Sequence, residues 1–131
     1  MTKRVALSRG EMEVARVVWQ LGRATVREAH EALPTQRKMD FATVQTYLRR
    51  LETKGYVRSR LSGHTRVYAP KIQAATVIRE TVEDLVDRLF GGEALPLVQH
   101  LIEDRAINTA EIAQLRRLLD RLEEESNESA K

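Results

Sequence analysis

The sequence predicts a mainly α-helical fold with a small β-hairpin. We expect an N-terminal winged helix-turn-helix domain over residues 1–72 and a C-terminal helical dimerisation domain over residues 73–131. Apolar residues follow a helical period through three short segments of the first part and then change to a period of two. The net charge changes sign between the two parts: residues 1–72 contain fifteen Lys and Arg and six Asp and Glu, and residues 73–131 contain seven and thirteen. This division is typical of a polyanion-binding domain joined to a part that does not bind the polyanion.

The first two helices are predicted from the residues that begin and end them. In a capping box a hydroxyl accepts from the backbone N–H three residues on, and an acidic side chain there reaches back. Two such pairs are present, Ser8 with Glu11 and Thr25 with Glu28. Gly22 is placed to end the first helix, and Pro34 blocks continuation of the second. We expect residues 34–40 to form a polar loop.

A third helix and a hairpin complete the predicted DNA-binding domain. The helix is expected over residues 42–54, with Asp40 as its cap and Gly55 as its stop. Its buried stripe has the spacing i, i+4, i+7 and consists of Val44, Leu48 and Leu51. Two β-branched and aromatic runs follow, 56–61 and 66–69, separated by a Ser-Gly-His-Thr turn. A basic third helix followed by a hairpin predicts a winged helix-turn-helix.

The polar residues of the third helix and the hairpin are predicted to bind DNA. Threonine and glutamine can contact base edges, and arginine can contact guanine or phosphate. Near the start and middle of the helix, where base contacts usually fall, stand Thr43, Gln45, Thr46 and Arg49. Two later residues are placed for phosphates or for the domain's own acidic groups, Arg50 and Lys54. The hairpin adds residues that can follow the backbone or enter a narrow minor groove, namely Arg58, Arg60, His64 and Arg66.

The C-terminal half is predicted to pair with a second copy of the chain. Its apolar residues form two seams with steps of three and four, which is a coiled-coil-like pattern, and a short helix lies between them. A helical segment of this size cannot bury both seams within itself. The expected dimer contacts are Ile78, Val82, Leu85, Leu89, Leu97, Leu101, Ile112, Leu115, Leu119 and Leu122. The charged tail, residues 123–131, is expected to fray.

Composition and motifs argue against several other classes of protein. The chain has no cysteine, which removes disulfides and thiolate metal sites and agrees with a cytoplasmic location. No apolar run is long enough for membrane insertion. The three histidines are far apart, and neither a glycine-rich phosphate loop nor a Ser/His/Asp set is present. We therefore expect no metal, no cofactor and no enzymatic activity.

The segment ATVQTYLRRLETKGYVRSRLSGHTRVYAP, residues 42–70, resembles the core and wing of the BlaI/MecI penicillinase repressor family. Leu7-Ser8, Trp19 and ATVREAHEAL at residues 24–33 extend the resemblance, which covers nearly the whole chain. It implies a homodimeric repressor that binds an inverted repeat on double-stranded DNA. The DNA contacts that it implies are Thr43, Thr46, Arg49 and Arg66.

The resemblance also implies control, in some members, by a membrane sensor-protease that triggers cleavage in the dimerisation region. The pair His100-Leu101 stands where relatives carry an Asn-Phe cleavage site. Ala42 replaces a threonine that is frequent in the family, so one polar contact with the operator is missing. A copper-responsive branch uses a C-terminal cysteine cluster, and the absence of cysteine excludes that route here.

Two other functions agree with the same sequence features. One is a winged-helix regulator that senses a small ligand directly, with a pocket between the C-terminal helices. The other is a protein-interaction adaptor without specific DNA binding. Sequence-specific and steeply salt-dependent binding to duplex DNA distinguishes a repressor from an adaptor.

Overall fold

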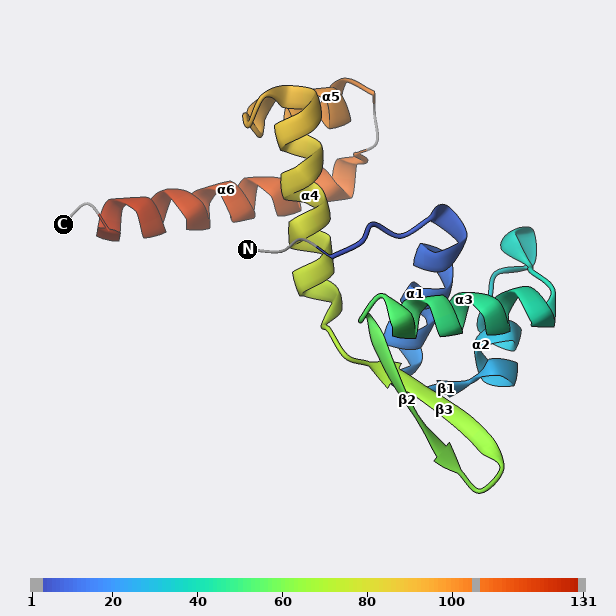
Figure 1. Cartoon of the computed structure of the whole chain (residues 1–131). Coiled ribbons are helices and arrows are strands. Elements are labelled where there is room, and N and C mark those ends of the chain that lie inside the picture. The colour runs from blue at the N-terminus through green and yellow to red at the C-terminus, as the bar shows by residue number, and fades with distance from the viewer. Residues whose placement is uncertain (1–3, 105–106, 130–131) are drawn as a thin grey trace. The chain divides into compact units, whose positions relative to one another are not determined.

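The computed structural model describes residues 4–104 and 107–129 (Figure 1). Contacts along the chain divide it into two units, Met1–Glu80 and Thr81–Lys131. This division comes later than the boundary expected after residue 72. The first turns of the following helix belong with the N-terminal unit, because Val77 is buried in its core and Glu80 forms an ion pair with Arg4.

The N-terminal unit is a winged helix, as the sequence predicts. Three helices cover one face of a small antiparallel sheet, and the β2–β3 hairpin extends beyond them (Figure 1). The sheet has the strand order β1-β3-β2. In chain order the elements are α1 (Arg9–Leu21), β1 (Ala24–Thr25), α2 (Val26–Ala32), a 3-10 helix (Thr35–Arg37), α3 (Phe41–Thr53), β2 (Val57–Ser62) and β3 (Thr65–Pro70).

The predicted capping boxes of the first two helices are confirmed. The Ser8 hydroxyl accepts from the Glu11 N–H at 3.2 Å, and the Glu11 carboxylate accepts from the Ser8 N–H at 2.8 Å. The corresponding distances for Thr25 and Glu28 are 3.1 and 2.9 Å. Asp40 is the N-cap of α3, but its side chain makes no capping hydrogen bond. The first two helices are therefore capped by side chains, and the third is not.

Two short elements depart from the sequence prediction. Strand β1 was not expected; its two residues pair with β3 through Ala24–Tyr68 and Thr25–Val67. A segment of two residues is too short to show the alternation that predicts a strand. Strand β1 is therefore recognised only by its pairing with β3. The predicted loop over 34–40 contains a single 3-10 turn, because Pro34 fixes the backbone entering it and three residues suffice for an i→i+3 turn.

The core of the N-terminal unit lies between the helices and the sheet. The predicted stripe of α3 is confirmed, since the side chains of Val44, Leu48 and Leu51 are fully buried. Tyr68 of β3 is also buried in this core. The indole N–H of Trp19 donates to the carbonyl of Ile72 at 3.0 Å, which holds the end of the sheet region against α1. The core thus fixes the angle between α3 and the hairpin.

The last three helices are α4 (Ala74–Phe90), α5 (Leu95–Glu103) and α6 (Thr109–Ser129). At the start of α6, Asn108 and Glu111 exchange hydrogen bonds of 2.9 and 3.0 Å, which cap the helix. The tail expected to fray from Glu123 instead remains helical to Ser129. Glutamate favours helix, and no glycine or proline interrupts this segment. Over the described residues, no helix is both long and apolar enough to cross a membrane.

Candidate nucleic-acid interface

The face of α3 opposite the buried stripe carries exposed polar side chains. A shallow depression of about 270 Å³ lies along it. The residues that line it are Thr46, Arg49, Arg50, Thr53 and Lys54. Thr43 and Gln45, also predicted as DNA contacts, lie at the sides of the helix and are half-buried. Thr53 was not among the predicted contacts, although its spacing of seven residues from Thr46 places both on one face.

The two threonines of this face are held in the same way. The Thr46 hydroxyl donates to the carbonyl of Ala42 at 3.0 Å, and the Thr53 hydroxyl donates to the carbonyl of Arg49 at 3.1 Å. Each oxygen can still accept a hydrogen bond from outside, and each methyl group can contact an apolar surface. The face therefore presents acceptors and methyl groups beside arginines, which is the set that reads bases in a major groove.

Arg49 of α3 and Arg66 of β3 both lie close enough to Tyr68 to affect its hydroxyl group. Burial raises the pKa of the Tyr68 hydroxyl; Glu52 adds to the effect, and the charges of Arg66 and Arg49 oppose it. Arg66 donates to the Ser59 hydroxyl at 2.9 Å, and Ser59 donates to the Glu52 carboxylate at 2.6 Å. This chain of hydrogen bonds joins the wing to α3 and places Arg66 beside the helix.

Arg50 is held over an aromatic ring. Its guanidinium carbon lies 5.7 Å from the centre of the Tyr47 ring, within the range of a cation–π interaction. The same ring packs against Gly10 so closely that an added Cβ there would lie 2.6 Å from a ring carbon. The glycine of α1 thus leaves room for the Tyr47 ring, which supports Arg50 at the edge of the interface.

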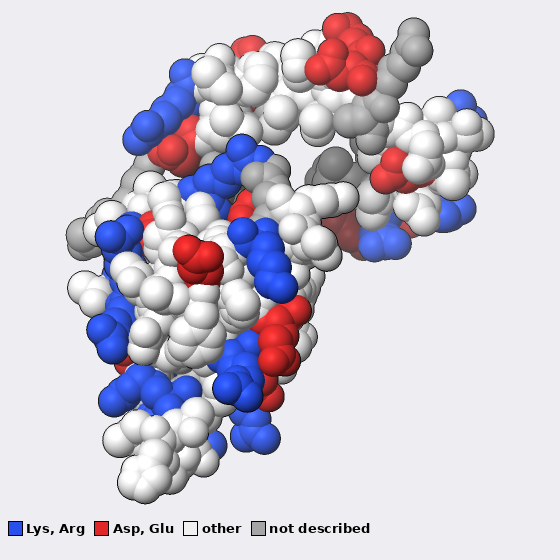
Figure 2. Space-filling view, turned by 90° about the vertical axis from the view of Figure 1, so that its right-hand side faces the viewer, with Lys and Arg blue, Asp and Glu red and all other residues white. Residues whose placement is uncertain are grey.

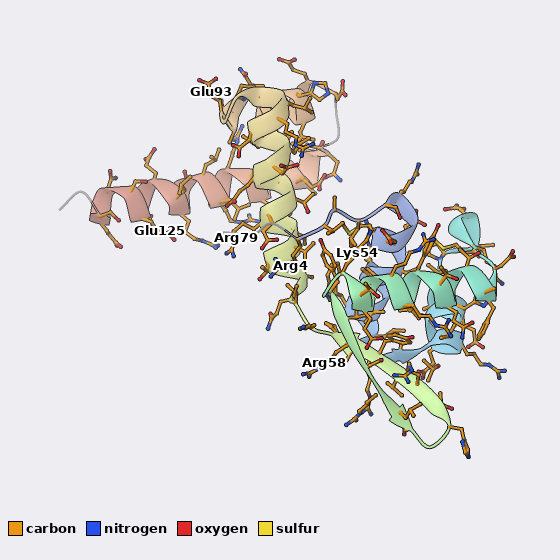
Figure 3. The ribbon with its side chains drawn as sticks, viewed as in Figure 1. Arg4, Lys54, Arg58, Arg79, Glu93 and Glu125 are labelled. Atoms are coloured by element: carbon orange, nitrogen blue, oxygen red, sulfur yellow. The ribbon has the colours of Figure 1, made fainter. Side chains whose placement is uncertain are left out.

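Lys54 is engaged inside the protein. Its ammonium nitrogen lies 2.7 Å from Glu11 Oε1 and 3.2 Å from the carbonyl of Ala6 (Figure 3). Burial favours a higher pKa for the Glu11 carboxyl, but hydrogen bonds from Lys54 and Ser8 outweigh it and hold the pKa below its ordinary value. Of the two expectations for Lys54, phosphate contact or pairing within the domain, the geometry favours the second.

The arginines of the wing lie on two faces of the sheet. Ser59 and Tyr68 are a cross-strand pair that faces the helices, so the alternate residues point the other way. Arg58 pairs with Ala69 and Arg60 with Val67 on that outer face. The Arg58 side chain extends outward from the hairpin (Figure 3). The predicted wing contacts therefore do not form a single surface, because Arg66 is on the helix side.

Charge alone does not outline the interface. On the face of the N-terminal unit that Figure 2 shows, Lys and Arg side chains are scattered, with acidic side chains among them. His64, predicted as a DNA contact, is exposed in the two-residue turn of the hairpin, next to Gly63 with φ of 65°. In the described parts of the chain, no cluster of His, Asp and Glu could hold a metal ion.

The sequence model of the penicillinase repressor family matches residues 7–121, from the start of the winged helix into α6. The chain belongs to this family. Among its relatives, the penicillinase repressor of Bacillus licheniformis is 27% identical over 120 residues, covering 92% of this chain and 94% of the relative. The methicillin resistance regulatory protein MecI of Mammaliicoccus sciuri is 23% identical over 119 residues, covering 91% and 97%.

The chain is also similar to a solved structure. It is the solution structure of the monomeric form of Bacillus licheniformis BlaI in complex with the blaP half-operator. This chain matches it at 31% identity, over 57% of this chain and 92% of that one, with a TM-score of 0.48. Members of the penicillinase repressor family are DNA-binding transcriptional repressors rather than enzymes, and this chain is one of them.

In this member of the family the predicted dimer contacts are apolar side chains with substantial exposure. Leu97 and Leu115 are half-buried, and the remainder range from Leu85 at 39% to Leu89 at 69%. Ile78 lies in the first unit by its contacts, and the others lie in the second. The predicted cleavage pair, His100-Leu101, lies within α5, where His100 is 3.2 Å from the carboxylate of Asp104.

Proposed function

We propose that this protein is a homodimeric repressor that binds an inverted-repeat operator through the outward face of α3. The observation that carries the proposal is the row of exposed threonine and arginine side chains along that face, Thr46, Arg49 and Thr53. Small side chains let the helix backbone approach the base edges, and Arg49 supplies a guanidinium for guanine. Thr43 and Gln45 flank this row, and Arg50 stands at its border for phosphate.

The wing supports the same arrangement. Arg66 is anchored through Ser59 to α3, so its guanidinium is held at a fixed position beside the recognition helix. His64 at the hairpin turn is exposed and can approach the sugar-phosphate backbone of DNA. The family match, which begins at residue 7 and spans the whole winged helix, supports duplex DNA as the ligand of this unit. Each winged helix of the dimer then occupies one half-site.

Homodimer formation through α4–α6 is supported by their exposed apolar seams. Val82 and Leu85 of α4 are 43% and 39% exposed, and Ile112 of α6 is 44% exposed. Pairing with a second copy removes this surface from water. The burial stabilises the dimer by about 25 cal/mol for each Å² of apolar area. Linking two winged helices, each of which binds one half-site, raises the avidity for DNA by about 10²–10⁴-fold without a new contact. The pairing is thus what makes the binding strong enough for repression.

Loss of the dimer is the proposed route to release of the promoter. Cleavage at His100-Leu101 by a sensor-protease cuts α5 and divides the predicted dimer surface. His100 is exposed and is not one of the predicted dimer contacts, which supports access to the pair from that side of α5. Each fragment that retains the winged helix then keeps only the α4 part of the predicted dimer surface, so the gain from linking two half-sites is reduced.

Selection of bound sites from random duplex DNA, read at two salt concentrations, tests the proposed function. An enriched inverted repeat with a fixed spacer is the expected result. Dimers of this class place their half-sites about one turn, roughly 34–36 Å, or a multiple of it apart. Binding without any enriched sequence contradicts the proposal, and binding to no duplex at all indicates an adaptor.

A further inference from the structure

The first turns of α4 are held by residues of the winged-helix unit. We call residues 74–80 the base of α4. Val77 in this base is 4% exposed and packs in the core of the unit. The Arg4 guanidinium donates through Nη1 to both carboxylate oxygens of Glu80 (Figure 3). The base of α4 is therefore attached on its apolar side by packing and at Glu80 by an ion pair.

Tyr56 joins the end of α3 to the chain that enters α4. Its N–H donates to the carbonyl of Leu51 in the last turn of α3 at 2.9 Å. Its carbonyl accepts from the Lys71 N–H at 2.9 Å, three residues before α4 begins. Its hydroxyl donates to the carbonyl of Val5 at 2.8 Å, and the residue is 5% exposed. One buried residue thus contacts the recognition helix, the entry to α4 and the N-terminal part of the chain.

The N-terminal segment, residues 4–7, contacts the same elements. The Lys54 ammonium group at the end of α3 donates to the carbonyl of Ala6 at 3.2 Å. Two residues earlier in the segment, Arg4 binds Glu80 of α4. The segment therefore runs from the end of α3 to the base of α4 before the chain enters α1.

The ion pair does not act alone. The side chains of Arg4 and Glu80 are 32% and 44% exposed, and such a pair contributes little to stability by itself. It lies close to the buried hydroxyl of Tyr56, however. Burial raises the pKa of that hydroxyl, the charge of Arg4 opposes the rise, and the charge of Glu80 adds to it. The pair and the hydrogen bond from Tyr56 therefore hold the same short segment.

A short connection leads into α4. Only residues 71–73 separate β3 from this helix. The Trp19 indole donates to the Ile72 carbonyl at 3.0 Å, and the Ile72 N–H donates to the Tyr56 carbonyl at 3.4 Å. Hinges in proteins are commonly a few such connecting residues, which absorb changes of backbone angle. Hydrogen bonds from both sides of the connection oppose that movement here.

We propose that the N-terminal segment and Tyr56 restrict pivoting of α4 at its base, and that this restriction makes the protein select operators by the spacing between half-sites. The inference rests on the proposed function, because it needs a dimer on two half-sites. Helix α4 continues to Phe90 and carries part of the predicted dimer surface. A pivot at its base changes the distance that two linked winged helices can span. Arg4 and Tyr56 are therefore positioning residues and not DNA contacts.

The test compares Arg4→Glu and Tyr56→Phe with the wild-type full chain. Arg4→Glu places a second carboxylate beside Glu80, and Tyr56→Phe removes only the hydroxyl. The probes are a half operator, the selected operator, and the same operator with its spacer changed by about one or two base pairs. Linkage raises avidity only when the spacing lets both units bind, so the preference for the selected spacer is expected to fall about tenfold in Arg4→Glu. A smaller fall is expected in Tyr56→Phe, with unchanged affinity for the half operator.

Two controls separate positioning from charge. Arg79→Glu makes the same change of charge at the exposed residue next to Glu80, and it is expected to keep the wild-type spacer preference. The charge swap Arg4→Glu with Glu80→Arg recreates the ion pair and is expected to restore that preference. An equal loss of preference in Arg79→Glu overturns the proposal, because charge then explains the effect. A swap that restores nothing overturns the role of the ion pair.

Amide hydrogen exchange of the free protein provides a readout without DNA. Exchange over residues 74–80 is expected to rise in Arg4→Glu and to remain as in the wild type in the charge swap. Faster exchange with an unchanged spacer preference overturns the link to the operator and leaves a purely structural contact. Unchanged exchange overturns the restriction itself. If the wild type selects no inverted repeat, the proposed function fails, while the exchange still shows whether the base of α4 is held.

Discussion

The ammonium group of Lys54, at the end of α3, lies 2.7 Å from the carboxylate of Glu11, near the start of α1. Glu11 is 2% exposed, and the same carboxylate oxygen accepts the Ser8 N–H of the capping box. One buried carboxylate therefore caps the start of α1 and holds the end of α3. The orientation of α3 depends on this pair as well as on the apolar stripe.

Lys54→Met is expected to lower the free energy of unfolding by roughly 3 kcal/mol. Removing one partner leaves the buried Glu11 carboxylate without its counter-charge, and breaking such pairs typically costs about 3–5 kcal/mol. Urea denaturation measures the loss, and adding Glu11→Leu is expected to recover part of it. The salt slope for DNA binding is expected to stay as in the wild type. A fall of about one in that slope contradicts the internal role of Lys54 and restores it as a phosphate contact.

The stability of the protein is expected to depend on the Glu11 carboxyl at low pH. Its folded-state pKa is below the ordinary value of 4.5, so its contribution is complete above that value and is lost as pH falls through the folded pKa. Wild type and Glu11→Gln are compared by denaturant unfolding from about pH 7 to pH 3. The wild type is expected to lose more stability than the variant below pH 4.5. If the stabilities of the wild type and the variant fell in parallel with pH, Glu11 would have the same pKa in the folded and unfolded states.

Arg49→Ala is expected to weaken specific binding by about 1–3 kcal/mol and non-specific binding by less. Arg49 lies on the outward face of α3, which in the proposed mode of binding enters the major groove. Affinities for the selected duplex and for a mixed-sequence duplex give the two values. Arg16→Ala, on α1, is the control and is expected to change neither the affinity ratio nor the rank of sites. Equal losses of affinity on both duplexes would mean that Arg49 contacts a phosphate and not a base.

Leu85→Asp is expected to prevent pairing of the protein and to lower operator affinity about 10²-fold or more. Leu85 lies in the middle of the α4 seam and is 39% exposed, so a charge there opposes burial against a second copy. Sedimentation measures pairing, and binding is measured on full and half operators. Glu83→Gln, an exposed neighbour, is the control. A variant that is monomeric but binds the operator with wild-type affinity would contradict the proposed role of the dimer.

The parts of the fold that the sequence predicted are those that depend on nearby residues. The capping boxes need only a hydroxyl and a glutamate three residues apart, and the stripe of α3 needs only a helical period. Strand β1 could not be predicted, because it exists only where Tyr68 and Val67 pass beside Ala24 and Thr25. Local patterns contain no information on such distant partners.

The candidate site shows the same limit. From the sequence alone, Lys54 looks like one more basic residue of the predicted DNA-binding helix. Only the fold shows that it pairs with Glu11, which is distant in sequence. The separation of Arg66 from Arg58 could have been predicted, because a two-residue turn fixes the register and hence the two faces of the hairpin.

The boundary between the two compact units falls inside a helix. Helix α4 runs unbroken from Ala74 to Phe90 with no glycine or proline, whereas the division comes after Glu80. A cut at His100-Leu101 would therefore leave the whole α4 seam on the fragment that reads DNA. That fragment would keep a residual tendency to associate, so its occupancy of a promoter would decline in a graded way as its concentration fell. Induction by cleavage would then respond to dosage rather than behave as an on-off event.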